Sequence, residues 1–234
     1  EIGLLTGSGL EYIKEQLWPL FADREISINC HVLPCNSTEY YIPNPDSPGS
    51  FIEIFRTSME DKVGFEKFQL IMKTIISQQA KIAEADYDIP FTGHHFQNRG
   101  SMINWSPIGR NANNGSRQQF IAMDKTYQIR SRHINMFRRL MLDEGVEDVT
   151  IKLGGDTSFD IYPTGWDKTF VLKHFPESDW DVIFVGDRCG PNGNDHELYE
   201  HLRHQERSFE TGGPEETIEI IDTYINRILG DLDD

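Results

Sequence analysis

The sequence has few cysteines, an excess of acidic over basic residues, and no long apolar run. Its only cysteines among 234 residues are Cys30, Cys35 and Cys189, and their odd number and spacing fit neither a disulfide framework nor a zinc template. No run of about 18 apolar residues and no basic leader with an apolar core is present, which argues against a membrane span and a signal peptide. We therefore expect a cytoplasmic protein with reduced, structural cysteines.

Basic residues are scarce overall but concentrated in one segment. The chain has 22 Lys or Arg against 38 Asp or Glu, a formal net charge of −16, so we expect no nucleic-acid partner and no anionic membrane partner. Residues 97–139 reverse this balance, with Asp124 as their one acid. The basic residues there are Arg99, Arg110, Arg117, Lys125, Arg130, Arg132, Arg138 and Arg139. This segment indicates a local anion site, and a solvated helix with a chance charge pattern explains it equally well.

The two ends of the chain carry the patterns of an α/β fold. Ile2–Leu5 predicts a strand, followed by a turn and a helix over Leu10–Leu20, which is half of a βαβ unit. Val182–Val185 is an unbroken apolar run, typical of a parallel strand buried on both faces. A closing helix is expected over Pro214–Leu229. Its apolar face comprises Ile218, Ile221, Ile225, Ile228 and Leu229.

Two clusters of helix-breaking residues, 44–50 and 162–166, divide the chain. They predict a core made of residues 1–49 and 165–234 and an inserted α+β unit over 50–164. The expected elements of the inserted unit are a helical stretch over 59–87, a strand near 102–105, a helix over 124–142 and a strand near 149–153.

The stretch FVGDRCGPNGND, residues 184–195, carries two aspartates around a Gly- and Asn-rich loop. Asp187 directly follows the predicted parallel strand, and Asp195 comes eight positions later. Ligands of open α/β sheets bind at the carboxyl ends of the strands, and carboxylate oxygens suit Mg²⁺. The pattern therefore predicts a magnesium site there, whereas the eight histidines follow no metal-ligand spacing.

The stretch GGDTSFDIYPTGWDK, residues 154–168, contains a predicted strand with two unlike faces. Phe159 and Ile161 alternate with Ser158, Asp160 and Tyr162, so burial of the apolar pair would present a hydroxyl and a carboxylate together. Such a pair binds sugar hydroxyls, although a solvated strand face has equal weight. Lys168 follows just before a short predicted helix and is placed to neutralise a phosphate, whereas a simply solvated lysine is the commoner case.

Three arginines and two hydroxyls are candidate phosphate ligands. Arg110 and Arg117 flank a Gly- and Asn-rich loop, and Arg99 lies eleven positions before Arg110. Guanidinium groups bind phosphate oxygens in a bidentate manner. Sequence alone does not show whether they converge. Thr6 and Ser8 follow the first strand, where a hydroxyl and backbone amides can hold phosphate, and a plain turn is an equal alternative.

Three motifs occur in one order: NWSPIGR (104–110), SFDIYPTGWDK (158–168) and GDRCGPNGNDHE (186–197). Together they resemble the eukaryotic phosphomannomutase family of the haloacid dehalogenase (HAD) superfamily. The resemblance implies an α/β fold, with a Rossmann-type core that has a parallel sheet and an inserted α+β cap domain. It also implies Mg²⁺-dependent interconversion of mannose 6-phosphate and mannose 1-phosphate through an aspartyl phosphate and a hexose 1,6-bisphosphate. A role in GDP-mannose biosynthesis and a homodimer through the caps are further implications.

The resemblance also implies roles for cap residues that match the family motifs. Arg99, Arg110 and Arg117 resemble the arginines that bind the distal phosphate and the sugar. Ser158 and Asp160 resemble the residues that contact the hexose.

In the core, the same resemblance implies catalytic and metal-binding roles. Lys168 resembles the lysine that neutralises the phosphoryl group in transfer, and Ser8 resembles the phosphate-binding hydroxyl. Asp187 resembles the Mg²⁺ ligand, with Asp195 supporting its loop.

Two departures from the family pattern leave alternatives open. The sequence contains no D-x-D-x-T motif, which in the family supplies the nucleophile and the general acid and base; we expect it upstream of Glu1. His201 stands where the family has an aspartate of a second cation site. A sugar phosphate phosphatase of the same superfamily is one alternative. A sugar-phosphate-binding protein without turnover is the other, if the chain truly starts at Glu1.

Overall fold

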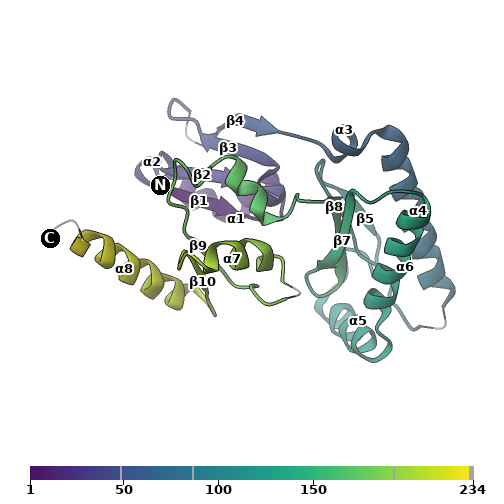
Figure 1. Cartoon of the computed structure of the whole chain (residues 1–234). Helices are drawn as coiled ribbons and strands as arrows, with labels where there is room; N and C mark the ends of the chain where they lie inside the picture. Colours follow the sequence, from purple (N-terminus) through teal and green to yellow (C-terminus); the bar gives the residue numbers. More distant parts are fainter. Residues whose placement is uncertain (48, 86, 192, 232–234) are drawn as a thin grey trace. The chain divides into compact units, whose positions relative to one another are not determined.

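The structure is a computed structural model that describes residues 1–47, 49–85, 87–191 and 193–231. The chain forms two compact units, Glu1–Trp166 and Asp167–Asp234. The first unit contains two four-stranded sheets and the second a two-stranded sheet (Figure 1). The elements of the N-terminal sheet and its helices are β1 (Ile2–Leu5), α1 (Leu10–Ala22), α2 (Arg24–Ser27), β2 (Cys30–Leu33), η1 (Cys35–Ser37), β3 (Glu39–Pro43) and β4 (Phe51–Arg56).

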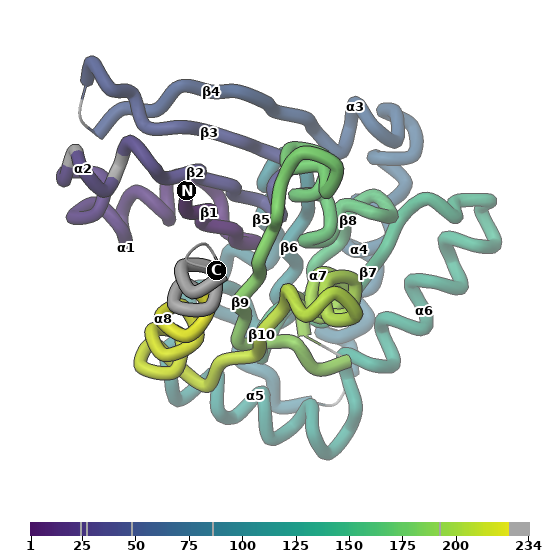
Figure 2. Tube along the Cα trace, turned by 60° about the vertical axis from the view of Figure 1, so that its left-hand side comes forward, coloured from purple at the N-terminus to yellow at the C-terminus, as the bar shows by residue number. Residues whose placement is uncertain are grey.

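The N-terminal sheet has the order β1-β2-β3-β4, and its strands run side by side in Figure 2. β1 and β2 are parallel, which confirms the predicted strand, turn and helix at this end. Ile13 and Phe21 of α1 are buried against Val32 and Tyr41 of the sheet. Burying each large apolar side chain contributes roughly 1.5–3 kcal/mol, which fixes α1 on this face.

The breaker cluster at 44–50 is the turn of a hairpin, because β3 and β4 pair antiparallel on either side of it. The backbone N–H of Asn44 donates to the carbonyl of Ser50 at 2.9 Å. The expected boundary between residues 49 and 50 therefore lies in the turn between two paired strands, and the division into a core and an inserted unit stays a prediction.

The second sheet of this unit has the order β5-β6-β8-β7 and is antiparallel throughout. Helices α4 and α6 and three of its strands share one apolar core. Its elements are α3 (Met59–Val63), α4 (Phe65–Glu84), β5 (Phe96–Asn98), β6 (Ile103–Trp105), α5 (Asn114–Tyr127), α6 (Ile129–Asp143), β7 (Val149–Gly154) and β8 (Ser158–Pro163). The strands predicted near 102–105, near 149–153 and around Phe159 and Ile161 are all confirmed.

Two predicted helices are each interrupted by a residue with positive φ. Gly64, at φ 84°, separates α3 from α4 within the stretch expected to be helical over 59–87. Gln128, at φ 52°, ends α5 and precedes α6. The prediction of a single helix over 124–142 was therefore wrong, since a left-handed residue cannot continue an α-helix.

The second unit contains η2 (Lys168–Lys173), β9 (Phe184–Gly186), α7 (His196–Arg203), β10 (Ser208–Glu210) and α8 (Pro214–Asp231). β9 and β10 pair in parallel, beginning at Phe184 opposite Ser208. The predicted strand over Val182–Val185 is thus displaced, because pairing starts only at Phe184, and Ile183 is 37% exposed. The short helix expected after Lys168 is a 3-10 helix that includes Lys168 itself.

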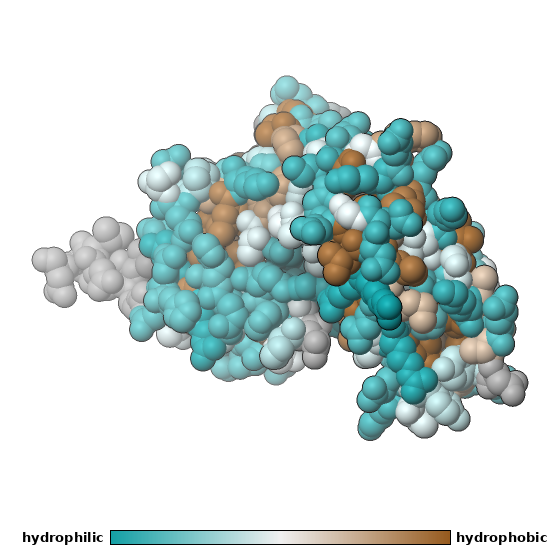
Figure 3. All heavy atoms as spheres, turned by 45° about the vertical axis from the view of Figure 1, so that its right-hand side comes forward, coloured by the Kyte–Doolittle hydropathy of each residue, from teal (hydrophilic) through white to brown (hydrophobic). Residues whose placement is uncertain are grey.

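The face shown in Figure 3 is mainly polar, with separate apolar patches. The predicted apolar face of α8 is exposed at Ile218 and Ile221; the side chains of Ile225, Ile228 and Leu229 lie outside the described residues. Of the helices that the structure describes, none combines the length and apolar character needed to cross a membrane.

Candidate active site

The loop after β1 is held by its carbonyl groups. The Thr6 carbonyl accepts the backbone N–H of Asn36 at 2.8 Å, and the Ser8 carbonyl accepts that of Cys35 at 2.9 Å. Cys35 and Asn36 belong to a left-handed turn, with φ angles of 51° and 59°. Non-glycine residues in this region store strain and cluster at functional sites. The turn directs its N–H groups at the loop that carries the predicted phosphate ligand Ser8.

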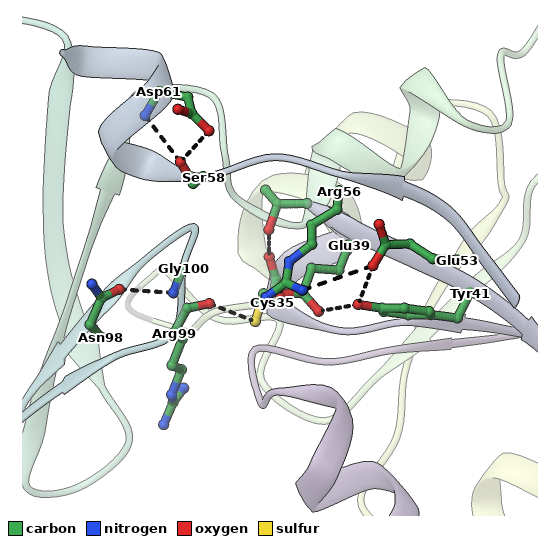
Figure 4. A network of polar contacts seen from close by, with 11 residues as sticks. Cys35, Glu39, Tyr41, Glu53, Arg56, Ser58, Asp61, Asn98, Arg99 and Gly100 are labelled. Carbon is green, nitrogen blue, oxygen red and sulfur yellow. Dashed lines mark hydrogen bonds and ion pairs between the residues drawn. The ribbon is translucent and has the colours of Figure 1, made fainter. Parts of the chain in front are cut away.

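Arg99 contacts this same loop. Its guanidinium donates to the Gly7 carbonyl at 2.8 Å and to the Gln97 side chain at 3.2 Å. Figure 4 shows the Arg99–Gly100 turn beside Cys35, whose thiol donates to the Arg99 carbonyl at 3.6 Å. Arg99 was predicted to bind the distal phosphate and sugar; in this structure its hydrogen bonds orient the β1 loop.

Arg110 is positioned by a close backbone approach. Gly109, at φ 84°, lies so near the backbone of Gly93 that a Cβ atom would overlap its carbonyl group. The N–H of Arg110 donates to the His94 carbonyl at 3.3 Å. The glycine of NWSPIGR is therefore required for the chain to turn here and to present the Arg110 guanidinium.

Asn104 joins Arg110 to the two predicted hexose ligands. Its Oδ1 accepts from Arg110 at 2.7 Å, and its Nδ2 donates to Asp160 at 2.7 Å and to the Ser158 hydroxyl at 3.2 Å. The pairing of β6 with β8 places Asn104 directly opposite Asp160. Three predicted site residues, Arg110, Ser158 and Asp160, thus form hydrogen bonds with one carboxamide.

The polar side of β8 is less solvated than expected. Phe159 and Ile161 are fully buried, as predicted, but Ser158 is also only 8% exposed. The Ser158 hydroxyl donates to the Gly154 carbonyl, and a Cβ at Gly154 would lie 2.8 Å from the Asp160 carboxylate. Gly154 therefore leaves the space that this carboxylate occupies.

Charges interact strongly around this carboxamide. Burial, with Arg99 and Arg117 nearby, lowers the pKa of Arg110, while Asp160 opposes that shift. Burial raises the pKa of Asp160, opposed by the Asn104 hydrogen bond and by Arg99 and Arg110. The structure thus brings both Arg99 and Arg117 within electrostatic range of Arg110, which the sequence did not reveal. Positive charges gathered around one guanidinium favour an anionic ligand.

In the second unit, Lys168 forms a buried ion pair with Asp195. The other carboxylate oxygen of Asp195 accepts the Arg188 backbone N–H at 3.1 Å. A Cβ at Gly186 would lie 2.7 Å from that oxygen. These contacts fix the loop between β9 and α7 and hold the lysine ammonium beside it.

Asp187 and Asp195 differ in what they can bind. Asp187 is exposed just after β9, so its carboxylate suits a hard cation that keeps much of its water. Asp195 is 1% exposed, and both of its carboxylate oxygens form hydrogen bonds.

His201, at the position of a family aspartate, contacts the Glu177 carboxylate at 3.0 Å. Within the described ranges, no group of three His, Cys, Asp or Glu side chains is arranged to hold a metal.

Asn104 is the site residue that sequence reasoning missed. It opens the motif NWSPIGR, yet an asparagine before a tryptophan carries no chemical pattern of its own. Only the pairing of β6 with β8 reveals its partners.

Comparison with known proteins decides the family. Residues 1–227 match the family model of eukaryotic phosphomannomutases. The chain is 31% identical over 226 residues to phosphomannomutase 2 of Dictyostelium discoideum, covering 96% of this chain and 83% of that protein. The chain belongs to the eukaryotic phosphomannomutase family. It is also 32% identical over 228 residues to the phosphomannomutase of Saccharomyces cerevisiae, covering 96% and 81% of the two chains.

Solved structures support the fold of this family member. The chain resembles the IMP-bound IMP-nucleotidase of Plasmodium falciparum with a TM-score of 0.61 at 14% identity, covering 97% of this chain and 59% of that one. At such identity the likeness concerns the fold alone. It confirms the predicted α/β fold.

Proposed function

We propose that this protein is a phosphomannomutase that interconverts mannose 6-phosphate and mannose 1-phosphate through a hexose 1,6-bisphosphate. The family match over nearly the whole chain carries this proposal. The arginines around Arg110 would bind the distal phosphate, and Asp160 and Ser158 would accept hydrogen bonds from the hexose hydroxyls. Because charge neutralisation dominates phosphoryl transfer, a site rich in arginine and lysine suits this reaction.

The second unit would supply groups for the transferring phosphate. Lys168 would donate to the phosphoryl oxygens, and Asp195 would hold its ammonium in place. Asp187 would hold Mg²⁺ because its carboxylate is exposed after β9; when bound, the ion neutralises charge on the phosphoryl group. In the first unit, Ser8 would bind a phosphate through its hydroxyl. The aspartyl nucleophile implied by the resemblance belongs to a motif that residues 1–234 do not contain.

We also propose a cytoplasmic homodimer, built through the region 50–164, that supplies mannose 1-phosphate for GDP-mannose formation. The exposure of Ile76, Met136 and Leu142 on α4 and α6 supports such an interface, since apolar side chains on neighbouring helices favour association.

Calorimetric titration of the 234-residue chain tests substrate binding. Mannose 6-phosphate should bind, and Arg110→Ala should weaken it at least tenfold because a charge-assisted contact is lost. Arg132→Ala, which removes an exposed arginine of α6, is the matched control and should leave the affinity unchanged. Equal affinity of Arg110→Ala and wild type would remove Arg110 from the site.

Product analysis on the protein of the complete reading frame tests the reaction. Mannose 6-phosphate with a trace of hexose bisphosphate should yield mannose 1-phosphate. Release of inorganic phosphate instead would indicate a phosphatase. Binding without any product would indicate a protein that holds sugar phosphates but does not convert them.

A further inference from the structure

Asn104 lies between an arginine and a carboxylate that would otherwise attract each other. We propose that Asn104 is a positioning residue that keeps Arg110 and Asp160 from forming a direct ion pair, leaving the guanidinium for a phosphate and the carboxylate for a sugar hydroxyl. The identity of these ligands rests on the proposed function, whereas the separation of the two charges does not.

The contacts of the carboxamide define its orientation. Its oxygen accepts from Arg110 at 2.7 Å and its nitrogen donates to Asp160 at 2.7 Å. A flipped amide would turn donor toward donor and acceptor toward acceptor, so the two charged neighbours permit one orientation only. The nitrogen also donates to the Ser158 hydroxyl at 3.2 Å and to the Phe159 carbonyl at 3.3 Å.

Burial prevents the carboxamide from moving aside. Asn104 is 3% exposed, and its place on β6 opposite Asp160 is set by the pairing with β8. Fully buried Trp105 follows it and stacks on Phe159 at 4.3 Å between ring centroids. The strand therefore cannot rotate Asn104 out without unpacking these rings.

Among side chains of this size, only a carboxamide performs this separation. An aspartate would place a second carboxylate against Asp160. A leucine would leave both charged groups without their hydrogen bonds, which is costly in a partly buried site. An alanine would open space in which Arg110 and Asp160 approach directly, and a paired arginine is a weaker ligand because phosphate must first break the pair.

A role in packing alone predicts a different response to mutation. If Asn104 only satisfies buried polar groups, its removal lowers stability but does not create a new interaction between Arg110 and Asp160. If Asn104 separates Arg110 from Asp160, its removal increases the interaction energy between these two residues. The coupling between their mutations in the absence of ligand therefore distinguishes the two roles.

The first experiment is a double-mutant cycle on urea unfolding, with Arg110→Met and Asp160→Asn, in wild-type and Asn104→Ala backgrounds. We expect the coupling, expressed as a factor in the unfolding equilibrium constant, to rise at least fivefold in the Asn104→Ala background. An unchanged factor would overturn the proposal. Asn104→Ser serves as the second background if Asn104→Ala does not fold, since its short side chain does not span the two groups. Asn98→Ala is the matched control because Asn98 is an exposed asparagine that accepts only a local N–H, from Gly100.

The second experiment measures binding of inorganic phosphate and of mannose 6-phosphate by ³¹P NMR titration. Asn104→Ala should weaken both at least tenfold, and Asn104→Ala/Asp160→Asn should regain phosphate affinity to within threefold of wild type, since Arg110 is released. Failure of this rescue would also overturn the proposal. A wild-type chain that binds phosphate but no hexose phosphate would refute the proposed function and leave the rescue test intact. If the chain binds neither, the mutant cycle alone decides.

Discussion

The ammonium group of Lys168 and the carboxylate of Asp195 form an ion pair in which both side chains are buried, 27 positions apart in the sequence. Asp195 also accepts the Arg188 N–H, so one carboxylate orients a lysine and a loop together. The same loop begins with exposed Asp187, to which we assign the cation.

Asp195→Asn should destabilise the protein. Removing one partner of a buried pair leaves the other charge uncompensated, and we expect the free energy of unfolding to fall by about 3–5 kcal/mol. Urea denaturation followed by circular dichroism measures this change. Asp187→Asn, at an exposed neighbouring site, should stay within about 0.5 kcal/mol of wild type. Similar stability of both variants would show that the pair contributes little.

Asp187→Asn should abolish cation binding in this loop. In the wild-type chain, Mn²⁺ used as a paramagnetic probe should broaden the amide signals around Asp187, because its carboxylate is exposed. The variant should lose this effect at the same Mn²⁺ concentration, while Asp179→Asn, which also removes an exposed carboxylate of this unit, should retain it. Persistent broadening in Asp187→Asn would place the cation elsewhere.

Gly154→Ala should impair sugar binding while the protein still folds. The new Cβ would meet the Asp160 carboxylate at 2.8 Å, so this carboxylate must move away from Asn104. We expect at least a tenfold loss of mannose 6-phosphate affinity and a stability loss of about 1–3 kcal/mol. Gly115→Ala on α5, where the nearest atom is 3.4 Å away, should bind normally. Normal binding by Gly154→Ala would exclude Asp160 from the site.

The free energy of unfolding should fall at alkaline pH because the Cys35 thiol ionises less readily in the folded protein than in the unfolded chain. Burial, with Glu39 nearby, raises the pKa of its thiol from 9.0 to about 11. The unfolded thiol ionises first, so this contribution is complete below pH 9 and is lost as pH rises toward 11. The loss attributable to Cys35 is of order 3 kcal/mol.

Urea unfolding of wild type and Cys35→Ala at pH 8, 9, 10 and 11 measures this loss. The wild-type curve should fall more steeply, and other titrating groups cancel in the comparison because both proteins contain them. Parallel curves would mean that the Cys35 thiol ionises alike in the folded and unfolded chains.

Local patterns determined much of this protein. The strand, turn and helix at residues 2–22 form as predicted because their apolar spacing matches the elements that bury them. The alternation of Phe159 and Ile161 with Ser158 and Asp160 likewise determined which side of β8 enters the core. The three motifs indicated the family because they contain several chemically distinctive residues in a fixed order and spacing.

Tertiary structure decided what depends on backbone conformation or on distant partners. Gln128 divides a helical stretch because it adopts a left-handed φ, and a glutamine in the sequence does not predict that conformation. The Arg99 guanidinium reaches the Gly7 carbonyl, 92 positions away. Asn104 gains its role only from the register that sets β6 against β8. Composition and periodicity describe only a few neighbouring residues at a time. These contacts depend instead on which strands and loops come together, and no short stretch of sequence specifies that.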